Sequence, residues 1–142
     1  MVPFFSRNEH PVGSLTTNMA TIKAKFIEEQ DLTIFTVEGD LLADEIIKYS
    51  SEYYESKPTK CVLWDATKGS VRNIKPDDFR RIAFAMKTYT HKRSGGKTAL
   101  VGNFEIDFGF SRMYQAYAEI EKLPIAYQAF RNIDEALAWL SE

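Results

Sequence analysis

The stretch Cys61-Val62-Leu63-Trp64-Asp65 decides the fold. Its four consecutive apolar residues lack the alternation of a half-exposed strand, so they are typical of a central strand covered on both faces. A second short strand of this kind, Thr98-Ala99-Leu100-Val101, comes after a segment long enough to hold a helix. Strands separated by helix-length segments favour a largely parallel sheet with right-handed crossovers.

Upstream of this stretch the chain predicts a hairpin followed by a helix. Residues 22–26 alternate between apolar and polar side chains, and residues 32–37 are rich in strand-forming types. The short polar connection at residues 28–31 implies an antiparallel pair, with the first strand at the edge of the sheet. Leu42, Ile46, Tyr49 and Tyr53 then recur at helical spacing.

Downstream of it the same alternation of helix and strand continues. Pro76 is suited to the first turn of a helix, and apolar residues from Phe79 to Tyr89 form one stripe. A further helix is expected around 110–120, a strand over 125–130 and a last helix capped by Asn132. The sequence therefore predicts an α/β fold of order ββαβαβαβα, with a mostly parallel β-sheet, an antiparallel edge strand and about four helices.

Composition narrows the classes of function. The 142 residues carry 18 basic and 20 acidic side chains, a net charge of −2, which gives no general attraction to nucleic acid. The single cysteine, Cys61, rules out an internal disulfide and favours a cytoplasmic location. No apolar run reaches the ~20 residues of a membrane span, and no cofactor motif is found.

The first 18 residues differ from the rest of the chain. Pro3, Pro11, Gly13 and a cluster of hydroxyl residues are typical of a flexible tail, so we expect a single domain over residues 19–142. The alternative is a docking arm that uses Phe4 and Phe5.

Three stretches resemble the STAS domain and the uncharacterised bacterial SpoIIAA-like (STAS/SEC14-type) proteins. They are Leu63-Trp64-Asp65; Thr98-Ala99-Leu100-Val101 with Phe108-Gly109-Phe110-Ser111-Arg112-Met113-Tyr114; and the ending from Ala129 to Leu140. The resemblance covers roughly residues 21–142, and its motifs are mostly structural. It implies a non-enzymatic module for protein–protein interaction or regulation, able to form a homodimer.

One departure from that resemblance concerns phosphorylation. Sporulation-type members carry a phosphorylated serine where the helix after the central strand begins. Here that position reads Ile74-Lys75-Pro76-Asp77-Asp78, with no hydroxyl group. This departure argues against a phosphorylation switch at this point. Whether Thr67 or Ser70, earlier in the loop, is ever modified stays open.

The carboxyl ends of the predicted parallel strands form the candidate ligand crevice, because ligands of open α/β sheets bind there. Arg112, near a helix N-terminus, could hold a carboxylate or phosphate. Alternatively, Arg112 pairs structurally with Asp65 or Asp107. The crevice is predicted to collect Asp65, Thr67 and Lys68 after one strand, and Asn103, Gly109, Ser111 and Arg112 after the next.

Three other features have ordinary structural interpretations. Gly95-Gly96-Lys97-Thr98 lacks the flanking elements of a phosphate loop. His91-Lys92-Arg93 places cations at a helix C-terminus. The aromatic residues at helical spacing are expected in the core, at a dimer interface where exposed, or along an apolar pocket; they are Tyr49, Tyr53, Tyr54, Phe79, Phe84, Tyr114 and Tyr117.

Two functional hypotheses follow. The first is the non-enzymatic interaction module, and the second is a binder of a small anionic or lipid-like ligand at the crevice. An enzyme ranks below both, because no nucleophile–base pair or metal-ligand set is found. A pocket of ~300 Å³ at the crevice would favour the second hypothesis, and a closed crevice beside a two-fold interface the first.

Overall fold

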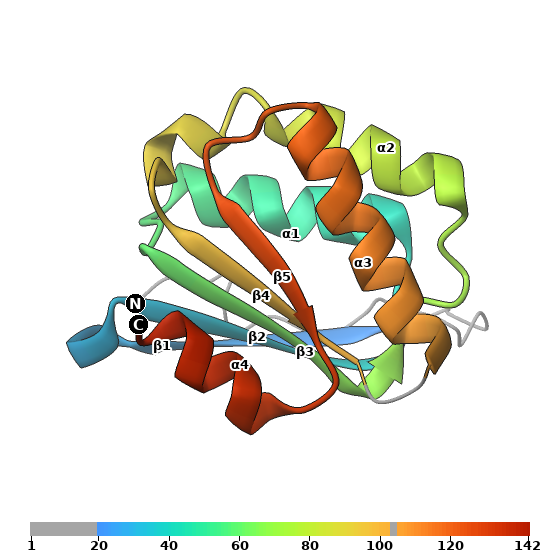
Figure 1. Ribbon diagram of the computed structural model, residues 1–142, viewed down its shortest axis with the longest axis horizontal. Helices are drawn as coiled ribbons and strands as arrows, with labels where there is room; N and C mark the ends of the chain where they lie inside the picture. Colours follow the sequence, from blue (N-terminus) through green and yellow to red (C-terminus); the bar gives the residue numbers. More distant parts are fainter. Residues whose placement is uncertain (1–19, 103–104) are drawn as a thin grey trace.

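The computed structural model describes residues 20–102 and 105–142, and Figure 1 shows a twisted sheet with helices on both faces. The predicted tail over residues 1–18 and the predicted site residue Asn103 lie outside this described part. The strands are β1 (Thr21–Ile27), β2 (Leu32–Asp40), β3 (Cys61–Ser70), β4 (Lys97–Val101) and β5 (Ala126–Phe130). The α-helices are α1 (Ala43–Glu55), α2 (Pro76–Met86), α3 (Glu105–Ile120) and α4 (Ile133–Leu140).

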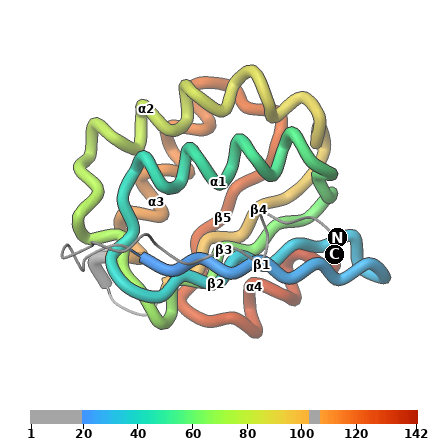
Figure 2. The backbone as a smooth tube through the Cα atoms, turned by 180° about the vertical axis from the view of Figure 1, so that it is seen from behind, coloured from blue at the N-terminus to red at the C-terminus, as the bar shows by residue number. Residues whose placement is uncertain are grey.

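The five strands lie side by side in chain order. β1 pairs with β2 antiparallel, and the pairs β2–β3, β3–β4 and β4–β5 are parallel. This confirms the prediction of an α/β fold with a mostly parallel sheet and an antiparallel edge strand. Three crossovers step across the sheet in one direction, so right-handed connections place α1, α2 and α3 on one face. After β5 the chain turns to the other face, which α4 covers (Figure 2).

Two hydrophobic clusters separate along this division. The larger lies between the sheet and α1–α3 and includes Phe35, Val62 and Ile82. The smaller lies between the sheet and α4 and includes Leu63, Ala99 and other side chains that point the opposite way from β3 and β4. Consecutive residues of these central strands therefore point to different layers, because side chains alternate along a strand.

The strand prediction was wrong at the end of β3. The sequence placed a loop after Asp65, but β3 continues to Ser70 and β2 to Asp40, paired through Glu38↔Lys68, Gly39↔Gly69 and Asp40↔Ser70. The register shifts between Thr36 and Glu38, where β3 advances by one residue more than β2. Glycine allows this polar extension, because a Cβ on Gly69 would lie 2.7 Å from the Gly39 carbonyl oxygen and Gly39 has a φ of 91°.

Helix ends follow the predicted capping chemistry. The Asn132 side chain accepts a hydrogen bond from the Glu135 backbone N–H at 2.9 Å, which confirms the predicted N-cap of α4. Pro76 occupies the first turn of α2, where the Asp78 carboxylate accepts from the Lys75 N–H. The helix α2 ends at Met86, earlier than the sequence suggested, and a 3₁₀ turn over Thr90–Arg93 leads into β4.

Candidate functional site

The predicted site residues of β3 lie within the strand, because β3 is longer than expected. Asp65 is in register with Val101 of β4, and its Oδ1 accepts hydrogen bonds from the Thr67 N–H (2.9 Å) and hydroxyl (2.6 Å). By alternation Asp65 shares the α4 face of the sheet with Leu63. Lys68 is exposed and lies opposite Glu38 of β2 in the strand register.

The other predicted site residues belong to α3, on the opposite face. The Arg112 guanidinium lies 6.0 Å from the Phe108 ring centroid, and Arg131 lies closer to the same ring, at 4.1 Å. Gly109 faces open space, and Ser111 lines a cavity described below. Asp65 thus belongs to β3 and Arg112 to α3, with no ion pair between them among the described residues. The ligand-binding role of the predicted set stays a prediction.

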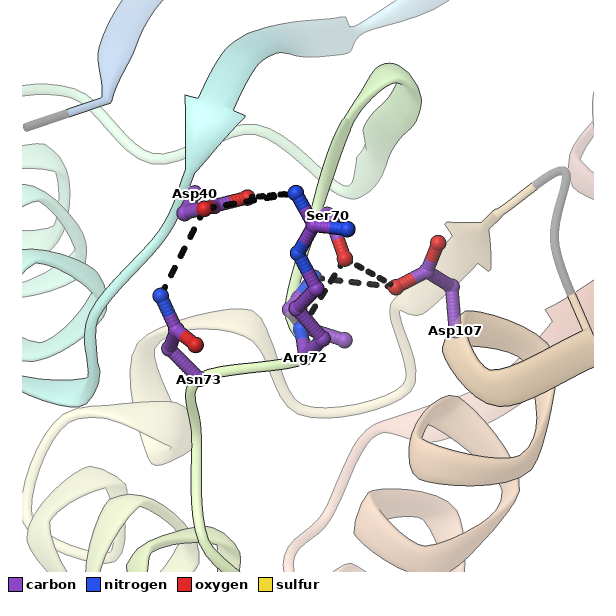
Figure 3. Close-up of polar contacts among 6 residues, drawn as sticks. Asp40, Ser70, Arg72, Asn73 and Asp107 are labelled. Carbon is purple, nitrogen blue, oxygen red and sulfur yellow. Dashed lines mark hydrogen bonds and ion pairs between the residues drawn. The ribbon is translucent and has the colours of Figure 1, made fainter. Parts of the chain in front are cut away.

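A different polar group occupies the carboxyl edge of the sheet, where β2 and β3 end and α3 begins (Figure 3). Ser70 Oγ donates to Asp107 Oδ1 at 2.8 Å, and the Val71 N–H donates to the same oxygen at 3.0 Å. Ser70 Oγ also accepts from the Arg72 N–H. On the outer side, the Arg72 guanidinium lies 3.3 Å from Asp40.

Asp107 joins the start of α3 to the end of β3. Its side chain is 1% exposed, and a Cβ on Gly102 would lie 2.6 Å from the Asp107 Cβ, so only glycine permits this approach. Its Oδ2 has no hydrogen-bond partner among the described residues. The Ser70 hydroxyl both donates and accepts within this group, so these contacts hold the end of β3, the loop after it and the start of α3 together.

A cavity lies between the sheet and the layer of α1–α3. Trp64 of β3 and Leu100 of β4 form part of its floor and are only half-buried, although both strands are central. Leu63 and Ala99, which point to the α4 face of the same strands, are fully buried. The cavity measures about 100 Å³, and helix residues such as Ile46, Phe79 and Tyr114 form its roof.

Arg93 lines one end of this cavity and is buried, at 6% exposure. All five of its N–H donors are used. Nε donates to the Thr59 carbonyl, Nη2 to the carbonyls of Lys60 and Lys97, and Nη1 to two hydroxyls, Tyr54 Oη and Thr98 Oγ1, both at 3.0 Å. Every acceptor is neutral, and no carboxylate contacts Arg93 within the described residues.

The positive charge of Arg93 extends along this end of the cavity. Burial raises the pKa of Tyr53, Tyr114 and Tyr127, and the nearby Arg93 charge opposes that rise in all three. Tyr114 and Tyr127 line the cavity with their rings edge to face at 5.3 Å. The cavity is therefore apolar over most of its wall and cationic with hydroxyl groups at one end.

Sequence reasoning missed the burial of Arg93. We expected His91-Lys92-Arg93 to place cations at a helix C-terminus, and His91 and Lys92 are indeed exposed. Arg93 instead turns inward, because the carbonyls that begin β3 and β4 meet there and need donors. A basic tripeptide before Ser94-Gly95-Gly96 carries no signal that separates its third member from the first two.

The aromatic residues divide among the predicted environments. Tyr53, Tyr54, Phe79 and Tyr114 are buried and line the cavity. Tyr49 and Tyr117 are half-buried, and Phe84 is 64% exposed.

Cys61 is half-buried, and burial raises the pKa of its thiol.

Over the described ranges, no cluster of three or more metal-ligating side chains occurs. Likewise, none of the helices in those ranges is long and apolar enough to cross a membrane. No protein-family model matches the sequence, and a search of curated proteins finds no match.

Proposed function

We propose that this protein is a binding module that takes a small, mainly apolar molecule into the cavity between the sheet and α1–α3. The observation that supports this most strongly is that Trp64 and Leu100, on two central strands at the cavity floor, are only partly buried. Protein interiors are close-packed, and their voids rarely exceed a water molecule. A cavity that reaches the central strands lowers the stability of the folded protein when it is empty. A bound molecule that fills it would offset this loss.

The size of the cavity limits that occupant. About 100 Å³ is somewhat less than an engineered apolar cavity of ~150 Å³ that binds benzene. It is also below the ~300 Å³ lower bound typical of pockets for larger ligands, which was our threshold for the strand-end crevice. The proposed ligand body is therefore a single ring or a short branched chain. This proposal therefore revises the second hypothesis: the lipid-like ligand is limited to this size, and its site is the cavity instead of the strand-end crevice.

The test is an NMR titration of the full chain with toluene, followed through the indole N–H signal of Trp64. The chain has two tryptophans, so Trp64 and Trp139 give separable signals on opposite faces of the sheet. We expect a saturable shift of the Trp64 signal and an unchanged Trp139 signal. Similar linear drifts of both signals would contradict the proposal.

A pair of tryptophan substitutions provides the matched control. Leu100→Trp adds an indole at the cavity floor and is expected to abolish toluene binding. Ile120→Trp adds the same group on α3, where Ile120 is 67% exposed, and should leave binding intact. Equal binding by both variants would place the toluene outside the cavity.

A second candidate function is self-association, as the first hypothesis suggested. Phe84 on α2 and Ile120 on α3 are the two most exposed large apolar side chains among the described residues. The ion pair of Lys87 with Glu121 (3.2 Å) joins the two helices beside them, and Lys87 also lies over the Phe84 ring. This favours one apolar surface that a second copy of the chain could cover.

Light scattering coupled to gel filtration tests this candidate. The unchanged protein is expected to elute as a dimer, and Phe84→Ser with Ile120→Ser as a folded monomer. A monomeric unchanged protein at high concentration would contradict self-association.

A further inference from the structure

The charge at the polar end of the cavity allows the ligand class to be narrowed, given the proposed function above. A buried guanidinium is normally compensated by a carboxylate, since an isolated charge is costly to remove from water. Arg93 is buried and has only neutral acceptors among the described residues. Its hydrogen-bond donors are all used, but no carboxylate of the described residues neutralises its charge.

Two hydroxyl groups carry that charge to the cavity wall. Tyr54 Oη and Thr98 Oγ1 both accept from Arg93 Nη1, and both residues line the cavity. A hydroxyl that accepts from a guanidinium still has its own proton to donate. Neither of these two donates to an acceptor in the part of the chain that the structure describes. The wall thus holds two spare O–H donors polarised by one cation.

We propose that the ligand is a small carboxylate with an apolar body, bound with its carboxylate oxygens toward the hydroxyls of Tyr54 and Thr98. Two donors on one cationic group match the two oxygens of a carboxylate, and charge-assisted hydrogen bonds of this kind are short and strong. The apolar body lies over Trp64 and Leu100. The negative charge offsets the buried charge of Arg93.

The direct test compares three probes of nearly the same shape by calorimetry on the unchanged chain at neutral pH. They are 3-methylbutanoate, 3-methylbutanamide and 3-methylbutylamine, which carry negative, neutral and positive head groups. We expect the carboxylate to bind roughly tenfold more tightly than the amide, since one added charge interaction near Arg93 is partly offset by desolvation. The amine should bind more weakly than the amide.

The outcomes separate this inference from the proposed function. If the amide binds as tightly as the carboxylate, and both move the Trp64 signal, the cavity is a binding site but the anionic class is wrong. If neither these probes nor toluene moves the Trp64 signal, the proposed function fails and this inference with it. If the carboxylate binds more tightly than the amide probe and shifts the backbone N–H signals of Tyr54 and Thr98, both stand.

A charge-removing variant adds an independent readout. Arg93→Met is expected to remove the preference for carboxylate over amide, whereas Arg80→Met removes an exposed charge on α2 and should keep it. Preserved preference in a folded Arg93→Met protein would overturn the inference. Because Arg93 also bonds three backbone carbonyls, that variant must first be checked for folding. Should it not fold, the three-probe comparison decides alone.

Discussion

At the scale of single residues, two buried charged side chains organise the two ends of the sheet. Arg93 supplies donors where β3 and β4 begin, and Asp107 supplies an acceptor where β3 ends. Both are almost fully buried. Each supplies hydrogen bonds that regular secondary structure does not provide at strand ends. Loss of either side chain should therefore lower the stability of the fold, besides any effect on ligand binding.

Arg93→Met should lower the free energy of unfolding by on the order of 3–5 kcal/mol, because it leaves several buried acceptors without donors. Chemical denaturation followed by circular dichroism measures this. The exposed Arg80→Met control should change stability by less than about 0.5 kcal/mol. A loss below ~1 kcal/mol for Arg93→Met would mean that water replaces the guanidinium, contrary to its burial here.

Asp107→Ala removes the acceptor of both the Ser70 hydroxyl and the Val71 N–H. We expect a loss of about 2–3 kcal/mol, since two buried donors lose their partner. Ser70→Ala removes only one of these donors and should cost about 1 kcal/mol. Equal effects of the two substitutions in urea denaturation would show that Asp107 acts only through Ser70.

At the scale of elements, the continuation of β3 beyond Asp65, paired with the end of β2, depends on close contact between Gly39 and Gly69. Gly69→Ala would place a methyl group 2.7 Å from the Gly39 carbonyl oxygen and is expected to destabilise by ~1–3 kcal/mol. Gly109→Ala is the matched control, because nothing lies within 4 Å of its added Cβ inside α3. That change should stabilise by ~0.5–1 kcal/mol through helix propensity. Differential scanning calorimetry of both variants checks the opposite signs.

The elements themselves were largely predictable, because strand and helix periods are written in local sequence. The apolar run at Cys61–Trp64 and the cap at Asn132 were identified correctly. The polar stretch that continues β3 to Ser70 was not, since its strand conformation depends on pairing with β2 rather than on its own residues. The inward turn of Arg93 depends likewise on carbonyls distant in sequence.

The candidate site was less predictable than the fold for the same reason. The sequence grouped Asp65 with Arg112 by assuming that both follow strand ends. In the structure, alternation along β3 gives Asp65 to the face covered by α4, while α3 packs on the other face. The cavity arises from how three helices meet the sheet, and no single segment encodes that gap.

At the scale of the whole molecule, the tyrosines packed between the sheet and the helices should make the protein less stable at high pH. Burial raises the pKa of Tyr114 and Tyr127 above the value of about 10 expected in the unfolded chain. The folded state therefore retains protons that the unfolded state loses, so stability is intact below pH ~10 and falls above it. Each tyrosine should contribute a slope of about 1.4 kcal/mol per pH unit there.

Urea denaturation at several alkaline pH values measures this slope. Tyr127→Phe should reduce this slope by the contribution of one tyrosine, and Tyr114→Phe should reduce it in the same way. A flat stability profile above pH ~10 would mean that the tyrosinates are solvated in the folded protein.

The most direct measurement of the central claim is the set of intermolecular NOEs between 3-methylbutanoate and the full-length chain at saturating ligand. The cavity predicts NOEs from the ligand methyl protons to the Trp64 indole and the Leu100 methyl groups, and none to Trp139 on the other face of the sheet. NOEs confined to exposed side chains such as Phe84, or none at all, would contradict the binding of a small carboxylate between the sheet and α1–α3.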